Sequence, residues 1–463
     1  LLNRGETVAV FQLESEGMMK TCRKFDVRDI EDINAILALY RPGPMDLIDE
    51  YIARKKGEKK VKYPHPLLEK VAAETFGIFV YQEQVMQAAQ VLAGYTLGGA
   101  DLLRRAMGKK DKEKMAKERE KFLKGCWEVN QIDEKKANEI FDLLEKFAGY
   151  GFNRSHSAAY AWVSYQTAFL KANHPAEFMA AVMSNEVGKT DKISVFVGEC
   201  QRMGIPILAP DVNRSSLKFA PERRESGEVI RYGVAAIKNV GEAAMEVMVA
   251  ERGRGGAFKG LADFCSRLDS RKVNRKSIES LIKCGAFDWT GIRRTDLFAQ
   301  LDDAMSAAAT IQRDRVAGQA SLFGEEQSFS AAPVVREGGG GTGPEWTLQE
   351  VLGFENELLG FYVTGHPLDE YRRELESDKF MKISGLVNAE NGGVVTIAGR
   401  VNTVEKRFAK KSNKPYAIIR FEDRRAWRSV FSGTVTRSSR RSWRLVGCWR
   451  SRVRWRTVTR WSG

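Results

Sequence analysis

The chain has 463 residues, of which 43% are hydrophobic and 29% are charged. This length exceeds what a single hydrophobic core usually holds, so the sequence predicts roughly three domains. No stretch approaches the roughly 18 to 20 apolar residues that cross a bilayer, which excludes a membrane span. The six cysteines lack metal-binding spacing and follow no signal peptide, which indicates reduced thiols in the cytoplasm and no zinc site.

The net charge of +14 is concentrated at one end of the chain. Residues 424–463 hold twelve arginines, no lysine and no acidic residue, together with five of the nine tryptophans. The other residues are almost balanced, with 62 basic against 60 acidic side chains. This tail shows neither helical nor strand periodicity, and we interpret it as translation in a shifted frame. An arginine-tryptophan arm that binds DNA is the alternative, so bulk charge assigns no function.

The alternating residues 7–13 predict a strand, and the pattern from about 29 to 210 is mainly helical. Apolar residues at spacings of three and four predict helices at 30–39, 82–92, 140–147, 158–172 and 176–183. A short strand is expected at 229–232, followed by two helix-turn-helix stretches before about 290. The sequence therefore predicts one large helical domain followed by smaller units.

Beyond residue 323 the composition changes twice. Residues 324–345 are rich in glycine and predict a flexible linker. Two alternating stretches, 394–401 and 416–421, predict strands joined by the basic turn 407–414. Because the strand pattern ends at Asp423, we expect an oligonucleotide-binding (OB) barrel that is incomplete and poorly stable.

A cluster of cations occurs within residues 101–110, where Arg104, Arg105, Lys109 and Lys110 approach a helix end. Arginine binds phosphate through a bidentate fork and lysine through a mobile point charge. These residues could neutralise a triphosphate or a DNA backbone. A solvated helix face is the alternative.

The second candidate site is the loop that leads into an apolar helix within residues 150–160. Asn153, Ser155 and Ser157 are all suitable helix N-caps, and a helix N-terminus attracts anions. Arg154 and His156 would strengthen that attraction, and Tyr150 could stack on a base or sugar. Ordinary helix capping beside a surface histidine is the alternative.

Five segments, 5–15, 41–44, 81–86, 94–110 and 147–165, resemble the fingers of the bacterial C-family replicative DNA polymerases, the DNA polymerase III alpha subunits. The resemblance covers roughly residues 1–423 with matching order and spacing. It implies that one set of residues borders the incoming nucleotide and the template: Arg104, Arg105, Lys109, Lys110, Tyr150, Asn153, Arg154, His156 and Ser157.

The resemblance also implies Mg²⁺ in the intact enzyme, held by paired aspartates that precede Leu1 and are absent from this chain. Asp302 and Asp303 are expected on an ordinary solvated helix. We therefore expect no catalytic or metal-binding residue here, and no polymerisation by this chain alone. The implied partners are primer-template DNA, deoxynucleoside triphosphate (dNTP), the sliding clamp (beta subunit) and other polymerase III holoenzyme subunits.

Residues 236–242 resemble the hairpin of a helix-hairpin-helix motif, and residues 273–287 would form its partner repeat. Such hairpins bind DNA phosphates without reading sequence, while a plain helix turn is the alternative. The residues expected to contact duplex DNA are Lys238, Asn239, Val240, Gly241, Lys272, Arg275 and Lys276.

The segment 318–324 resembles the sliding-clamp motif of the family. Leu322 and Phe323 would enter an apolar pocket of the clamp, while Gln319, Ala320 and Ser321 complete the motif. Packing onto the preceding helix is the alternative. In the OB region, single-stranded template would meet a set of basic and aromatic residues: Arg400, Lys406, Arg407, Phe408, Lys410 and Lys411.

The predicted fold class is mainly α and multidomain, with helical fingers, tandem helix-hairpin-helix motifs and a small, incomplete β barrel of OB type. The predicted domains are 1–185 (fingers, whose start could include the palm edge), 186–317 (helix-hairpin-helix, DNA and clamp binding), 318–324 (clamp motif), 325–347 (linker), 348–385 (helical connector), 386–423 (partial OB-fold) and 424–463 (aberrant tail). The predicted function is part of a replicative DNA polymerase. A non-catalytic DNA- and clamp-binding module, or an inactive truncation product, is the alternative.

Overall fold

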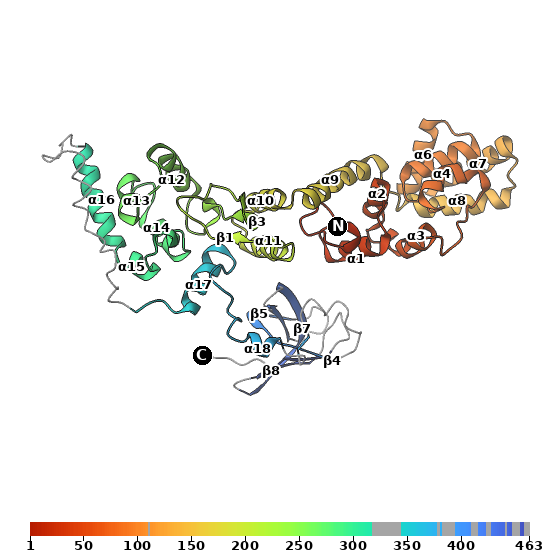
Figure 1. Ribbon diagram of the computed structural model, residues 1–463. Coiled ribbons are helices and arrows are strands. Elements are labelled where there is room, and N and C mark those ends of the chain that lie inside the picture. Colours follow the sequence, from red (N-terminus) through yellow and green to blue (C-terminus); the bar gives the residue numbers. More distant parts are fainter. Residues whose placement is uncertain are drawn as a thin grey trace. The chain divides into compact units, whose positions relative to one another are not determined.

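The computed structural model describes residues 1–109, 112–316, 344–376, 380–381, 394–408, 415–422, 427–439, 442–446 and 454–457. The described chain is mostly helical, as the sequence predicts (Figure 1). It divides into two compact units, Leu1–Phe178 and Met179–Gly463. Among the described residues, no helix combines the length and the apolar character needed to cross a membrane.

The first unit opens with turns where the sequence predicts a strand. After a 3₁₀ helix, η1 (Leu2–Arg4), Val10 donates a backbone hydrogen bond to Thr7 and Leu13 donates one to Val10. Thr7, Val10 and Leu13 are fully buried, so the buried residues recur every third position instead of every second. The predicted strand is wrong because these residues form two consecutive turns, each with a residue in the left-handed region.

The rest of the first unit is helical. Its elements are α1 (Glu16–Phe25), α2 (Ile30–Leu39), η2 (Pro44–Leu47), α3 (Ile48–Lys55), η3 (Pro66–Leu68), α4 (Glu69–Ala72), η4 (Ala73–Thr75), α5 (Gln82–Ala93), α6 (Leu97–Lys109), α7 (Lys112–Asn130), α8 (Glu134–Ala148) and α9 (Arg154–Asn173). The predicted helices at 30–39, 82–92, 140–147 and 158–172 are confirmed within α2, α5, α8 and α9.

Two hydrophobic clusters hold these helices. One is formed mainly by α5 to α8, with Phe122 and Phe141 fully buried at its centre. The other joins the N-terminal turns to α1, α2, α3 and α9. Capping fixes where the helices begin, since Asp29 and Asp133 accept hydrogen bonds from the first turns of α2 and α8.

The boundary between the two units lies within α10 (Pro175–Asn185), which confirms the helix predicted at 176–183. The second unit continues with α11 (Thr190–Arg202), β1 (Ile207–Leu208), β2 (Ala220–Arg224), β3 (Gly227–Arg231), η5 (Val234–Ala236), α12 (Glu242–Gly255), α13 (Leu261–Arg267), α14 (Arg275–Lys283), η6 (Asp288–Thr290), α15 (Arg294–Ala299), α16 (Leu301–Val316), α17 (Leu348–Leu359) and α18 (Arg372–Leu375). Strand β3 confirms the strand predicted at 229–232 and lies between β1 and β2 in a small mixed sheet.

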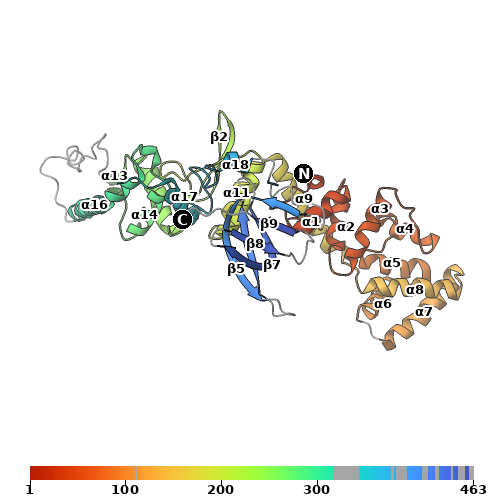
Figure 2. The same cartoon turned by 90° about the horizontal axis from the view of Figure 1, so that it is seen from below.

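The last described residues are strands: β4 (Val394–Ile397), β5 (Arg400–Phe408), β6 (Pro415–Glu422), β7 (Trp427–Ser439), β8 (Ser442–Val446) and β9 (Arg454–Thr457). Strands β5 to β8 form an antiparallel sheet in sequence order (Figure 2). Strand β4 pairs with β9 in parallel. The predicted strand 394–401 is divided between β4 and β5. Strands β7, β8 and β9 also lie beyond Asp423, where the sequence predicted no further strands.

Candidate nucleic-acid interface

Two loops that are far apart in the sequence meet beside α9. Arg41 Nη2 donates a hydrogen bond of 2.8 Å to the carbonyl of Tyr150. The Arg41 guanidinium also lies 4.3 Å from the ring centroid of Phe152. Gly43 has φ 102°, and an added Cβ there would come within 2.7 Å of the Tyr150 ring. The loop therefore needs glycine for its conformation and for the close approach of Tyr150, which is 49% exposed.

The start of α5 joins the same surface. Tyr81 and Phe152 form a parallel bridge, in which Gln82 N donates to the carbonyl of Phe152 at 2.9 Å. The Gln82 amide also donates to Gly151 O at 3.2 Å and accepts from Arg104 Nη1 at 3.1 Å. Arg104 is thereby connected to the Tyr150 loop through one side chain.

The predicted cation cluster is partly engaged within α6. Asp101 accepts from Arg104 at 2.8 and 3.0 Å and pairs with Arg105 at 2.8 Å. The hydrogen bond from Arg104 is the main cause that lowers the pKa of the Asp101 carboxyl. Arg105 keeps 62% of its side chain exposed, against 23% for Arg104. Lys109 ends α6, and Lys110 lies outside the described residues.

The N-terminus of α9 is capped from within the protein. Among the three candidate caps, Asn153 is the one used, because its side chain accepts from His156 N at 2.8 Å. The Glu83 carboxylate of α5 accepts from Arg154 N at 3.0 and 3.1 Å and from the Asn153 amide at 3.0 Å. The helix dipole attracts an anion, as the sequence suggests, but this anion is the chain's own carboxylate.

Arg154 is held by two further acidic side chains. Its Nη2 lies 2.7 Å from Glu74 and 3.2 Å from Glu31, and the guanidinium lies 5.4 Å from the Tyr81 ring centroid. Partial burial lowers the pKa of Arg154, but Glu74 and Glu31 outweigh that effect and raise it. The side chain is 37% exposed, so it presents only part of its charge to solvent.

His156 and Ser157 differ in accessibility. His156 is exposed and its ring lies 4.4 Å from that of Tyr160, measured between centroids. Ser157 is 1% exposed, and its hydroxyl donates to the carbonyl of Arg154 at 3.1 Å. Ser157 therefore packs inside the first turn of α9, whereas His156 faces solvent.

The first predicted hairpin connects η5 to α12. Lys238, Asn239 and Gly241 are exposed, while Val240 is 6% exposed and anchors the turn. Asn239 has φ 66°, and the backbone N–H of Lys238 donates to Leu358 O at 2.9 Å. A Cβ added to Gly241 would meet no atom within 4 Å, so the backbone of Gly241 is open to a partner.

The second hairpin precedes α14 and repeats this arrangement. Val273 is 1% exposed, and Asn274 caps α14 by accepting from Ser277 N at 3.0 Å. Lys272 and Lys276 are exposed. Arg275 is already paired with Glu279 and with Asp302, which accepts from Arg275 at 2.8 and 3.2 Å. Among the predicted duplex contacts in this hairpin, the two lysines are thus better presented than Arg275.

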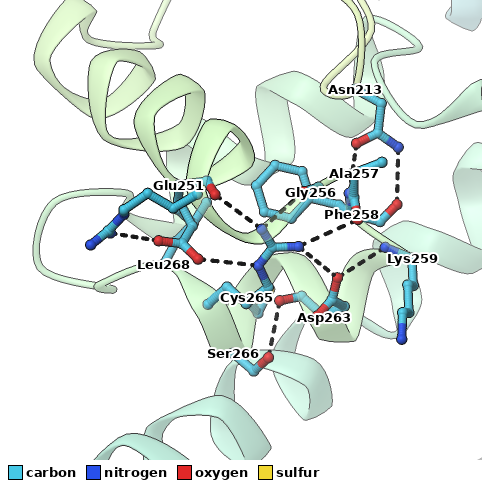
Figure 3. Close-up of polar contacts among 12 residues, drawn as sticks. Asn213, Glu251, Gly256, Ala257, Phe258, Lys259, Asp263, Cys265, Ser266 and Leu268 are labelled. Atoms are coloured by element: carbon cyan, nitrogen blue, oxygen red, sulfur yellow. Dashed lines mark hydrogen bonds and ion pairs between the residues drawn. The ribbon is translucent and has the colours of Figure 1, made fainter.

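Arg267, whose side chain is 12% exposed, links the end of α12 to α13, and Figure 3 shows the residues around this contact. Arg267 at the end of α13 donates to the carbonyls of Glu251 and Gly256 at 3.1 and 3.0 Å, and to the Asp263 carboxylate at 3.3 Å. Its guanidinium lies 4.4 Å from the Phe258 ring centroid. These contacts fix the end of α12 against α13.

Several predicted residues lie outside the described structure, namely Gln319, Ala320, Ser321, Leu322, Phe323, Lys410 and Lys411. Lys406 and Arg407 lie on β5, which ends at Phe408, 66% exposed. Arg400 at the start of β5 donates to the Tyr362 hydroxyl at 2.6 Å. In the described part of the chain, no group of three His, Cys, Asp or Glu residues is placed to hold a metal ion.

Sequence reasoning missed Glu83, Gln82 and Arg41 as parts of this site. Each lies in one of the segments that resemble the polymerase fingers, but only the folded chain shows that they contact the Tyr150 loop. An acidic residue beside two glutamines carries no local signal for capping a helix 70 residues later.

Comparison with known proteins identifies two regions. Residues 1–130 match the bacterial DNA polymerase III alpha subunit finger domain, and residues 204–297 match a helix-hairpin-helix motif. The chain is 46% identical over 431 residues to DNA polymerase III subunit alpha of Haemophilus influenzae, covering 92% of this chain and 36% of that protein.

Two other relatives show a similar identity and coverage. The Escherichia coli K12 protein of the same name is 46% identical over 440 residues, which are 92% of this chain and 37% of the relative. The Caulobacter vibrioides protein is 45% identical over 425 residues, with 91% and 36% covered. The chain thus spans little more than a third of the length of these relatives. With fingers and hairpins matched in the predicted order, the chain belongs to the family of bacterial DNA polymerase III alpha subunits.

Proposed function

We propose that this chain supplies the nucleotide- and DNA-contacting surface of a bacterial replicative polymerase, which performs template-directed DNA synthesis from dNTPs in the cytoplasm. The observation that carries the proposal is the convergence of the Arg41 loop, the start of α5, Arg104 and the Tyr150 loop on one surface of the first unit. Residues brought together from four segments of the sequence are typical of a binding site on a rigid scaffold.

The chemistry of this surface suits a nucleotide held through side chains. The exposed guanidinium of Arg105 and the partly exposed guanidinium of Arg104 can contact phosphate. Tyr150, 49% exposed, can stack on a base or sugar. Since Glu83 occupies the N-terminus of α9, the backbone N–H groups there are a less favourable place for phosphate than α6.

The second unit would hold the duplex through its two hairpins. Lys238, Gly241, Lys272 and Lys276 are exposed at the turns, where they can contact the DNA backbone without reading sequence. In the intact enzyme, Mg²⁺ would be held by carboxylates in parts of the protein other than this chain. The sliding clamp and other holoenzyme subunits are the proposed protein partners.

Fluorescence anisotropy with a labelled primer-template tests the proposal. The wild-type chain should bind at low salt, and its affinity should fall steeply as salt rises because phosphate contacts release counterions. R104A and R105A should each weaken binding, whereas K124A, which removes a 75% exposed lysine on α7, should change it little. Absence of binding at low salt, or equal affinity in all three variants and the wild type, would contradict the proposal.

A primer-extension assay tests the expected inactivity of this chain in the absence of the rest of the polymerase. The chain alone, with Mg²⁺ and dNTPs, should leave the primer unextended while still binding it. Extension by the purified chain would show that it holds its own catalytic carboxylates and would overturn the expected inactivity.

A further inference from the structure

A line of aromatic rings extends from the candidate nucleotide site along α9. Ring centroids lie 5.5 Å apart for Phe152 and His156, 4.4 Å for His156 and Tyr160, and 5.3 Å for Tyr160 and Phe11. Arg41 covers the Phe152 ring at the other end. The line therefore connects the Tyr150 loop to the N-terminal turns.

Phe11 is presented at the tip of these turns by a rigid support. Its backbone N–H donates to Thr167 Oγ1 at 3.1 Å, and its carbonyl accepts from Ser164 Oγ at 2.9 Å. Val10 on one side of it is fully buried. Phe11 nevertheless remains 36% exposed and Tyr160 37% exposed. The backbone anchors hold an apolar ring at the surface, where water gives it no favourable contact.

We propose that Phe11 and Tyr160 form a stacking surface for an unpaired base of the template strand, extending the candidate nucleotide site along α9. The proposal rests on the function proposed above. Aromatic rings interleaved with cationic or polar groups are typical of single-strand binding, because every base has a face that can stack. The Arg41 guanidinium and the exposed His156 provide those groups here.

A base is a better occupant than a protein partner because the line is continuous with the site that would hold the nucleotide. The other exposed aromatic residues of α9, Trp162, Tyr165 and Phe169, form a separate group with ring separations of 5.8 and 6.2 Å. No ring contact among the described residues joins that group to Phe11 or Tyr160. Phe169, 48% exposed, is therefore a matched control on the same helix.

The test uses the complete chain and a primer-template whose template overhang carries 2-aminopurine at the first unpaired positions. Stacking on an aromatic ring should change the fluorescence of this base when the wild-type chain binds. F11A and Y160A should each lose most of that change and weaken binding to the overhang substrate by about tenfold. Y160F and F11W should restore both, and F169A should resemble the wild type.

Folding is not expected to fail in F11A, since Thr167 and Ser164 contact its backbone and not its ring. A blunt duplex with a paired 2-aminopurine should show no dependence on either residue. The inference would be overturned if F11A and Y160A bound the overhang substrate with the same affinity and the same fluorescence change as the wild type, while R104A and R105A still bound DNA more weakly. If the wild-type chain bound no DNA at all, the function proposed above would be overturned instead.

Discussion

At the scale of single residues, Glu83 changes how the nucleotide site is understood. The sequence shows a helix start with Arg154 and His156, which suggests a binding site for phosphate. In the folded chain, Glu83 accepts hydrogen bonds from Arg154 N and the Asn153 side chain, and so satisfies that helix start. We therefore propose the guanidinium groups of α6 as the phosphate-binding groups of the candidate site.

Gly241 offers a residue-scale test of duplex binding. A methyl group at this position would contact no atom within 4 Å, and φ is −73°, which alanine adopts readily. We expect G241A to fold with a melting temperature close to that of the wild type. The added methyl group should nevertheless obstruct a DNA phosphate and weaken duplex binding several-fold.

Anisotropy with a blunt duplex and a thermal melt would measure the two effects separately. G253A is the matched control, because Gly253 lies on α12 with open space around its Cβ but away from the hairpin. Unchanged duplex affinity in G241A would remove the hairpin backbone from the binding surface.

The cysteines provide a test of pH dependence. Burial raises the pKa of Cys22 and Cys126 to about 11 and that of Cys265 and Cys284 to about 12, from an ordinary 9.0. These four thiols should resist thiol-reactive dyes at pH 8 until the chain unfolds. Because the unfolded thiols lose protons first, stability should fall as pH rises above 9. Rapid native-state labelling at any of these positions, located by mass spectrometry, would contradict the buried environment.

At the scale of elements, periodicity predicted the helices correctly, but it predicted a strand at residues 7–13, which form turns. Residues 30–39 form α2 at the predicted positions because apolar spacing and the Asp29 cap agree. Residues 7–13 alternate, but their burial depends on contacts with α9, where Lys171 donates to the carbonyls of Glu6 and Val8 at 2.7 and 2.8 Å. The pattern of neighbouring residues cannot predict a contact with a residue about 160 positions away in the sequence.

Helix α17 illustrates an element held by a buried ion pair. Glu355 is fully buried, lies 3.1 Å from Arg294 of α15 and accepts from the backbone N–H groups of Val363 and Thr364 at 2.8 and 2.9 Å. This pair attaches residues 344–364 to α15, although residues 300–343 separate the two in sequence.

Replacing Glu355 should leave Arg294 with Asp288 as its remaining carboxylate partner and leave the backbone N–H groups of Val363 and Thr364 without their acceptor. E355A is expected to lower the free energy of unfolding by about 1–3 kcal/mol. Urea denaturation followed by circular dichroism measures the change. E357A on the same helix removes an exposed carboxylate and should cost little. A comparable loss in both variants would argue against the ion pair as the cause.

At the scale of the whole molecule, the chain contains two compact units whose roles should be separable. The first unit carries the candidate nucleotide site and the second carries both hairpins. The clamp-motif residues at 319–323 lie outside the described structure and remain a prediction.

Clamp binding can be tested on the complete chain. Changing Leu322 and Phe323 together to alanine should reduce binding to the sliding clamp at least tenfold, because apolar anchors dominate such short motifs. Calorimetric titration with purified clamp gives the affinity, and anisotropy with DNA confirms that the variant is otherwise intact. Retained micromolar affinity in the double variant would count against this motif.

The sequence by itself determined the family, the mainly helical fold, most helix positions and the hairpins, because these depend on motifs and short-range periodicity. Only the tertiary structure decided which candidate residues are accessible. Ser157 is buried, Arg275 is already paired and the Glu83 carboxylate accepts from the first N–H group of α9. Accessibility and charge pairing arise from contacts between distant segments, and the order of residues along a chain does not encode them locally.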